Sequence, residues 1–180
     1  PGNAYGVFVV EPYAFLADGL SGLQVINISD PANPALAGSR DTPGDASDIF
    51  VSGNYAYISD GLPGLQILNI STPSSPSLSG TFNTNGLAFR VFVSGTLAYV
   101  ADEYTGLQIV NVSSPGSPSF EGSYLTPNQG HARNVFISGN YAYVADGPVG
   151  LQILDIANQA SPFFVGRYGT SNSAQKVAVS

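Results

Sequence analysis

The sequence predicts an all-β fold, a β-propeller of four-stranded antiparallel blades, from three observations. The phrase Asp-x-x-x-Gly-Leu-Gln occurs four times, and it begins at Asp18, Asp60, Asp102 and Asp146. Successive aspartates are 42, 42 and 44 residues apart, and a fixed period of about 20 to 50 residues is typical of solenoids, propellers and arrays. Each repeat contains four short runs rich in β-branched and aromatic residues. No segment shows the 3.6-residue period of an amphipathic helix.

Each repeat is predicted to form one blade, because its inner strands are apolar on both faces. Segments such as 91–93 and 67–68 are continuously apolar, whereas an antiparallel sheet with one wet face would alternate. Both faces must therefore be covered, and without helices the cover is another sheet. Stacked four-stranded sheets of about 42 residues favour a propeller. A parallel β-helix has shorter coils, and immunoglobulin-like sandwiches need about 100 residues per unit.

The repeat phasing divides a single domain, residues 1–180, into blades. The predicted blades are residues 4–43, 46–85, 88–129 and 132–173, and the first strand of a fifth blade follows at 174–180. Residues 1–4 correspond to 43–46 of the next repeat, so the sequence opens within a loop. We therefore expect it to be part of a larger propeller.

The second repeat illustrates the predicted elements in order. Its strands are predicted at residues 49–51, 55–59, 65–70 and 78–83. The turn between the first two contains Gly53 and Asn54, which tolerate the positive φ of hairpin turns. The third strand follows a turn at 60–64. Prolines bracket the connector at 73–76 and suit a loop before an edge strand, because proline donates no ladder hydrogen bond.

Composition excludes several function classes. The net charge is -7 with only five Lys and Arg residues, which argues against nucleic acid and against anionic membrane surfaces. No apolar run approaches the roughly 20 residues of a transmembrane helix, so no membrane insertion is expected. The chain has no Cys, which excludes disulfides, thiolate metal sites and a cysteine nucleophile.

The third strand of each repeat carries a recognisable pentapeptide. It occupies residues 23–27, 65–69, 107–111 and 151–155. These segments, and the phrase at 137–147, resemble the LVIVD repeat, a β-propeller repeat of bacterial and archaeal exported and cell-surface proteins. The departures are Gln at the second position and Asn in place of the final Asp in three repeats. The resemblance covers nearly the whole chain and implies an extracellular or cell-surface propeller. It supplies no catalytic residues.

Polar residues that recur in every repeat are interpreted as structural. The four repeat aspartates are predicted to cap backbone N–H groups of glycine-containing turns. Calcium is the alternative, but each loop offers about one carboxylate, with Asp102-Glu103 as the exception, whereas calcium takes six to eight oxygens. No cofactor is therefore expected. The repeated glutamines are predicted to satisfy backbone groups between blades, with lining of a ligand channel as the alternative; they are Gln24, Gln66, Gln108 and Gln152.

The final residue of the pentapeptide is interpreted in the same way. Asn27, Asn69 and Asn111 begin Asn-x-Ser triplets that match the N-glycosylation pattern. Asp155 fills the fourth equivalent place and cannot be glycosylated, so turn capping is the predicted common role.

Residues that differ between repeats are the candidate ligand-binding residues. The position just before the first strand is held by Gly6, Asp48, Arg90, Asn134 and Lys176. It should lie near the mouth of the central channel, although a solvated position that varies freely is the alternative. The extra length of the 44-residue step falls in the loop at 124–130, which leads to His131 and Arg133. Loops on a rigid scaffold carry function, but a lone histidine is also a common surface residue. The candidates are Asp48, Arg90, His131, Arg133, Asn134 and Lys176.

These observations favour a non-enzymatic recognition or scaffolding propeller that binds a protein or glycan at its loop face. One alternative is a structural subunit that self-assembles by strand pairing through residues 174–180. Another is a hydrolase or lyase acting on polysaccharide, which would need two carboxylates about 5–10 Å apart at the channel mouth. A channel filled by apolar side chains would favour the binding interpretation. No Gly-x-Ser-x-Gly motif or histidine cluster is present, so no catalytic residue is assigned.

Overall fold

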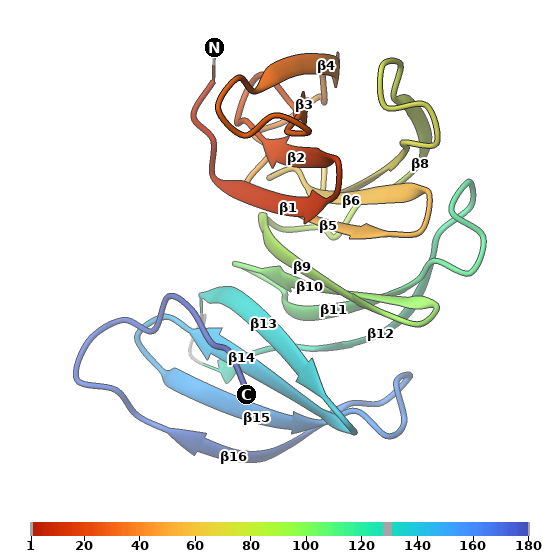
Figure 1. Ribbon diagram of the computed structural model, residues 1–180. Helices are drawn as coiled ribbons and strands as arrows, with labels where there is room; N and C mark the ends of the chain where they lie inside the picture. The colour runs from red at the N-terminus through yellow and green to blue at the C-terminus, as the bar shows by residue number, and fades with distance from the viewer. Residues whose placement is uncertain (1, 128–130, 180) are drawn as a thin grey trace.

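The computed structural model describes residues 2–127 and 131–179, and within them it is all-β with no α-helix (Figure 1). The first sheet contains β1 (Gly6–Val10), β2 (Tyr13–Ala17), β3 (Leu23–Asn27) and β4 (Ala35–Arg40). The second contains β5 (Asp48–Ser52), β6 (Tyr55–Ser59), β7 (Leu65–Asn69) and β8 (Ser77–Phe82). The third contains β9 (Ala88–Ser94), β10 (Leu97–Asp102), β11 (Gly106–Asn111) and β12 (Ser119–Tyr124). The fourth contains β13 (Ala132–Ser138), β14 (Tyr141–Asp146), β15 (Gly150–Asp155) and β16 (Phe163–Tyr168).

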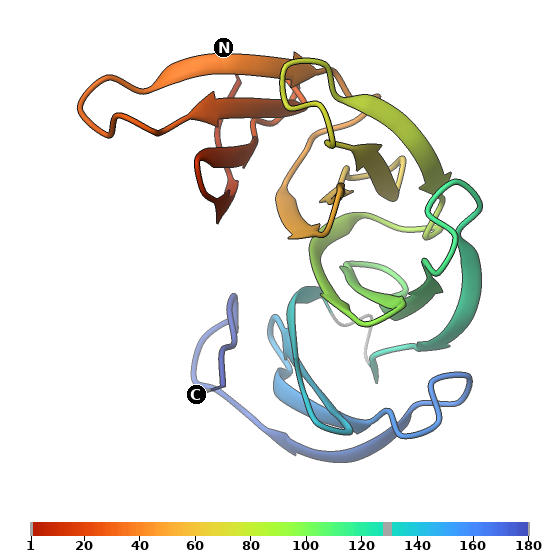
Figure 2. The ribbon, with the colours of Figure 1, turned by 45° about the vertical axis from the view of Figure 1, so that its right-hand side comes forward.

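The sheets follow one another along an arc in the manner of propeller blades. In each sheet the strands are neighbours in chain order and pair antiparallel, so every blade is a simple meander. Figure 2 shows the four blades curving around an open space, with the first and last blades at opposite ends of the arc. The predicted blade architecture is confirmed, and the sheets do not close into a ring.

The hairpin between the first two strands has glycine at its first turn position in the second, third and fourth blades, whereas the first blade has Glu11 there. Gly53, Gly95 and Gly139 have φ of 57°, 59° and 57°, and a Cβ added at any of them would meet nothing within 4 Å. Glycine is therefore needed for its backbone conformation and not for space. The following Asn54 does not have positive φ, so the expectation that both turn residues do was wrong. In φ the turn matches type II′.

The hydrophobic core lies between consecutive blades, as the two-faced apolar strands predicted. Tyr57, Leu65 and Ile67 of the second blade pack against residues of the third that include Val91 and Val100, all of them buried. Equivalent clusters join the first blade to the second and the third to the fourth. Each sheet therefore provides the apolar cover for the next.

A glycine in the fourth strand allows close packing of neighbouring blades. The fourth strands carry a register shift, and Gly38, Gly80 and Gly122 lie beside it. A Cβ on Gly80 would be 2.3 Å from the carbonyl oxygen of Pro115 in the next blade. The equivalent Gly166 of the fourth blade would meet nothing within 4 Å. This glycine therefore permits the connector of the next blade to approach.

The C-terminal segment differs from the predicted first strand of a fifth blade. Residues 174–179 form one isolated bridge, between Ala174 and Gly147, and no strand. The other first strands are stabilised by the second strand of their own blade, as β13 is by β14. Among the described residues, 174–179 have no ladder pairing beyond the bridge at Ala174. No helix in the described residues is long and apolar enough to cross a membrane.

Candidate functional site

The variable position before the first strand borders the concave side of the arc. One hollow there, of about 510 Å³, is lined by Tyr5, Asp45, Ser47, Phe89, Arg90, Arg133, Gln175 and Lys176. We call it the axial hollow. An adjoining hollow of about 400 Å³ shares Tyr5, Arg90 and Lys176 with it, and adds Asp48 and Asn134. The structure therefore gathers five of the six predicted residues around one concavity, and His131 lines neither hollow.

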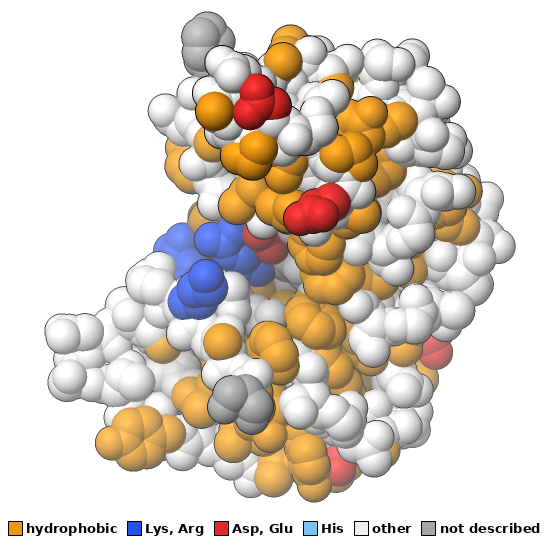
Figure 3. All heavy atoms as spheres, in the orientation of Figure 1, with side chains coloured by type: hydrophobic (Ala, Val, Ile, Leu, Met, Phe, Trp, Pro, Cys, Tyr) orange, Lys and Arg blue, Asp and Glu red, His pale blue; other side chains and the backbone are white. Residues whose placement is uncertain are grey.

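Basic side chains are concentrated at the axial hollow. Arg90, Arg133 and Lys176 are three of the five basic residues of a chain with net charge -7. Figure 3 shows Lys and Arg side chains gathered within the concavity of the molecule. They come from the third blade, the fourth blade and the C-terminal segment, which are far apart in the sequence. The predicted juxtaposition of these residues is therefore a property of the blade arrangement.

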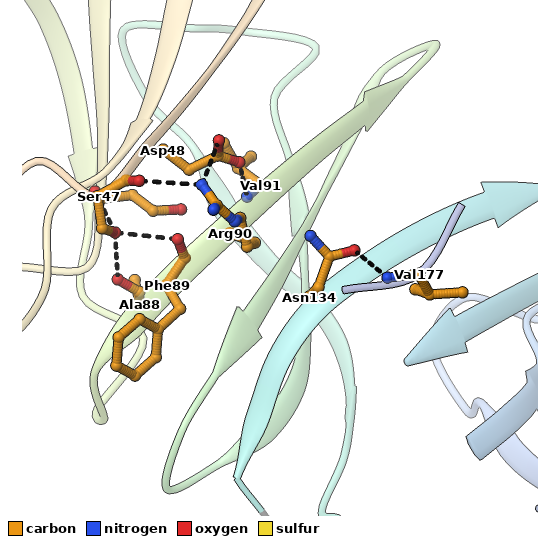
Figure 4. A network of polar contacts seen from close by, with 9 residues as sticks. Ser47, Asp48, Ala88, Phe89, Arg90, Val91, Asn134 and Val177 are labelled. Carbon is orange, nitrogen blue, oxygen red and sulfur yellow. Dashed lines mark hydrogen bonds and ion pairs between the residues drawn. The ribbon is translucent and has the colours of Figure 1, made fainter. Parts of the chain in front are cut away.

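Arg90 and Asp48 link the second blade to the third (Figure 4). Arg90 Nη1 donates to Asp48 Oδ1 at 2.8 Å and to the carbonyl oxygen of Ser47 at 3.0 Å. The other carboxylate oxygen, Asp48 Oδ2, accepts a hydrogen bond from Val91 N at 3.1 Å. Burial raises the pKa of the Asp48 carboxyl above its ordinary value, and the nearby Arg90 guanidinium opposes that rise. Asp48 is therefore held by its partners and does not vary as a free surface position.

Asn134, two positions further along the series, makes a similar link to the C-terminal segment. Its Oδ1 accepts a hydrogen bond from Val177 N at 3.3 Å, as Asp48 Oδ2 accepts from Val91 N (Figure 4). Gly6 begins the series, and a Cβ there would lie 2.9 Å from Asp48 Cα. An oxygen acceptor at this position thus joins consecutive first strands. In contrast, Lys176 is exposed to solvent and makes no ion pair among the described residues.

Glu103 organises the remaining predicted residues. Its Oε1 lies 2.5 Å from Arg133 Nη2 and 2.9 Å from His131 Nδ1, and the Glu103 residue is only 7% exposed. The Arg133 guanidinium carbon also lies 4.4 Å from the centroid of the Phe89 ring, a cation–π contact. Sequence reasoning missed this role of Glu103. The available signal was the doubled acid Asp102-Glu103, where the other repeats have Asp-Gly.

Among the described residues, only Asp102 of the four repeat aspartates caps the turn that follows it, as predicted. Asp18 accepts from Gly2 N of the entering loop, and Asp146 accepts from the Gln152 side chain. Asp102 Oδ1 accepts from Tyr104 N and Thr105 N of its own turn, and from Leu87 N of the preceding loop. Asp60 instead accepts from Gly44 N and the Thr42 hydroxyl, both in the loop that enters its blade. The described residues contain no cluster of three or more His, Cys, Asp or Glu suited to a metal ion.

The repeated amides also act within their own blades. Gln24, Gln66 and Gln108 each donate to a carbonyl three residues earlier, in the turn before the third strand. The predicted role between blades was therefore wrong. The predicted turn capping by Asn27, Asn69, Asn111 and Asp155 is confirmed, because each Oδ1 accepts from the N–H two residues later.

An aromatic row runs along the first strands beside the axial hollow. The ring centroids of Phe8 and Phe50 are 4.9 Å apart, those of Phe50 and Phe92 5.2 Å, and those of Phe92 and Phe136 5.1 Å. Phe50, Phe92 and Phe136 line the adjoining hollow. Each of the two hollows is lined by one acidic residue, Asp45 in the first and Asp48 in the second. The concavity as a whole therefore contains both carboxylates beside the aromatic row.

Comparisons with known proteins agree on the fold. The sequence profile of the LVIVD repeat matches residues 1–42, 43–84, 85–126 and 129–170. No curated protein gives a significant match. The crystal structure of the computationally designed Ika8 protein is similar with a TM-score of 0.75 at 9% identity, over 93% of this chain and 49% of that one.

A second similar structure is a functionally unknown protein from Desulfotomaculum acetoxidans. Its TM-score is 0.76 at 17% identity, over 96% of this chain and 59% of that one. The chain thus spans about half to three-fifths of the length of these two structures. At these identities the likeness shows the fold alone.

Proposed function

The chain belongs to the LVIVD repeat family, and from that premise we propose that it is a non-enzymatic recognition propeller of an exported or cell-surface protein. The axial hollow is its binding site, and a protein or glycan that carries negative charge is its ligand. The observation that supports this proposal is the convergence of Arg90, Arg133 and Lys176 on one concavity of an acidic chain.

Electrostatics make this concavity different from the rest of the surface. A net charge of -7 disfavours anions over most of the molecule. Three of the four charged residues that line the hollow are basic, the exception being Asp45, and a cleft with mainly one sign of charge concentrates ligands of the opposite sign. The two other Lys and Arg residues, Arg40 and Arg167, lie exposed on the outermost strands β4 and β16 of two different blades. They are therefore not part of the axial hollow. Anion binding is thus directed to one place.

The hollow is also built in the way that binding sites generally are. Its volume of about 510 Å³ falls in the range of roughly 300–1,000 Å³ for small-ligand pockets. Arg90 and Arg133 are held by Asp48 and Glu103, so their guanidinium groups are positioned before a ligand arrives. The row of phenylalanines fills the inner side of the blades with apolar rings, which supports binding over catalysis.

Substitution of the residues that line or support the hollow tests the proposal. Arg90→Ala, His131→Ala and Arg133→Ala should each weaken binding to acidic members of a panel of immobilised peptides and oligosaccharides. Arg167→Ala is the matched control for lost charge, and circular dichroism verifies that each variant is folded. The proposal is overturned if no panel member binds, or if all three variants keep the wild-type affinity.

A further inference from the structure

We propose that the ligand of the axial hollow is a uronate, a sugar residue with one carboxylate, at an accessible position of an acidic glycan. This inference rests on the proposed function, because it names the ligand class for the same site. It is carried by the charge balance of the hollow, by its neutral lining and by the free donors of its basic residues.

The charge balance at the hollow favours a ligand with a single negative charge. Three cations line it, but Asp48 and Glu103 pair with Arg90 and Arg133. Lys176 is then the one cation with no ion pair among the described residues. The Asp45 carboxylate also lines the hollow, so the lining residues and their ion-pair partners have no net charge, and a phosphate dianion would be opposed more strongly than a singly charged ligand. A carboxylate carries one charge, which can contact the unpaired ammonium of Lys176.

The free donors are placed to bind a carboxylate. Arg90 uses Nη1 for both of its hydrogen bonds, to Asp48 and to Ser47. A guanidinium has five N–H donors in a rigid planar fork, so the remaining donors of Arg90 are available to a ligand. Arginine matches the planar geometry of a carboxylate, and Lys176 adds an exposed ammonium from the C-terminal segment. Both residues line the axial hollow and can contact the same ligand.

The neutral lining favours a sugar over a simple organic acid. Gln175 and the Tyr5 hydroxyl offer hydrogen-bond donors and acceptors. The Asp45 carboxylate accepts hydrogen bonds from hydroxyl groups, whereas the Ser47 hydroxyl already donates to backbone carbonyls. Tyr5 and Phe89 add aromatic surface, against which the apolar face of a sugar ring can pack. A fatty acid would leave these polar groups unpaired, which costs free energy. A hydroxylated ring with one carboxylate pairs with both kinds of surface.

Titration with digalacturonate tests this assignment. The ligand is added to the 180-residue chain at low ionic strength and followed by isothermal titration calorimetry. Its dimethyl ester, which has the same sugar rings without the charges, is the control ligand. Lys176 is exposed, so Lys176→Gln should fold normally and weaken binding about 2- to 5-fold, the scale of one exposed ion pair. Lys176→Arg should retain binding, and so should Arg167→Gln, which removes an equal charge elsewhere.

The outcomes separate the ligand class from the proposed function. Binding of digalacturonate but not of its ester, with the stated dependence on Lys176, supports the inference. Binding of the peptide acetyl-Glu-Glu-amide instead, with the same dependence on Lys176, overturns the sugar assignment and leaves the recognition function standing. Equal binding of acid and ester, or equal binding by Lys176→Gln and wild type, overturns the assignment as well. If neither ligand nor any member of the panel binds, both proposals fail.

Discussion

The Arg90–Asp48 pair predicts a pH-dependent loss of stability when Arg90 is replaced. Arg90→Gln removes the guanidinium whose Nη1 lies 2.8 Å from Asp48 Oδ1, and it leaves a carboxylate whose side chain is 18% exposed. Exposed ion pairs contribute about 0–1 kcal/mol, whereas breaking a buried pair costs about 3–5 kcal/mol. For this partly exposed pair we expect the free energy of unfolding at pH 7 to fall by about 1–2 kcal/mol.

The direction of the pH dependence follows from the pKa of Asp48. Burial already raises that pKa above 3.8, and Arg90 acts in the lowering direction, so the substitution raises it further. Folded Arg90→Gln therefore takes up a proton at a higher pH than the unfolded chain does. Its free energy of unfolding recovers as the pH falls through the folded pKa. The difference from wild type should be largest at neutral pH and should shrink as the pH approaches 3.8.

Urea unfolding followed by tyrosine fluorescence measures this difference, with Arg167→Gln as the control for lost charge. The double variant Asp48→Asn/Arg90→Gln completes a double-mutant cycle. Asn134 shows that asparagine can accept the inter-blade hydrogen bond at this position, so Asp48→Asn keeps the link to Val91. Arg90→Gln should then change stability by less than about 0.5 kcal/mol in that background. Equal losses at pH 7 and pH 4, or equal losses in both backgrounds, would refute the reasoning.

Urea unfolding measures three further predictions, and the first two use repeat-equivalent residues as internal controls. Gly80→Ala should lower the free energy of unfolding by about 1–3 kcal/mol, because its Cβ would lie 2.3 Å from Pro115 O. Gly166→Ala should not lower it, because its Cβ would meet nothing within 4 Å. Equal effects of the two substitutions would contradict the packing argument. Leu65→Ala, at a fully buried position, should lower the free energy of unfolding by about 2–5 kcal/mol. Leu151→Ala should lower it less, because the Leu151 side chain is only partly buried. A larger loss for Leu151→Ala would contradict this prediction. Burial raises the pKa of the Asp60 carboxyl above its ordinary value, so the folded protein loses stability as this group ionises. The free energy of unfolding of wild type should therefore fall relative to that of Asp60→Asn as the pH rises from 3.8 through the folded pKa. Parallel pH profiles of the two proteins would disprove this prediction.

The blades and their strands could be predicted because they depend on patterns that repeat locally. Strand β6 begins and ends at the predicted residues, and β7 ends one residue early, at Asn69. Superposition of the repeats also identified Arg90, Asn134 and Lys176 as neighbours of the axis, since equivalent positions of successive blades must face the same side. A regular repeat thus predicts the places of residues far apart in the sequence.

Contacts between unlike residues could not be predicted in this way. The pairing of Glu103 with Arg133 and His131 occurs once, so no other repeat reveals it. The inter-blade hydrogen bonds of Asp48 and Asn134 depend on side-chain rotamers and on the distance between blades. The terminal segment copies a strand in sequence, but a strand also requires a partner, which local sequence does not supply.

The structural and the binding interpretations of the variable position are compatible, and the geometry explains why. The link between consecutive first strands needs one oxygen acceptor, which Asp48 and Asn134 both provide. Arg90 has no side-chain acceptor and instead donates a hydrogen bond to Asp48 of the preceding blade. The third and fourth blades therefore pack together without an acceptor at this position. Lys176 at the fifth position is exposed and bears no such link. The blade interface is thus stabilised mainly by the buried apolar side chains of the other strands, and charge at this position can change from blade to blade without loss of the fold. A repeat scaffold of this kind can therefore gather basic residues on an otherwise acidic surface, with Arg90 and Lys176 at the variable position and Arg133 at the position just before it.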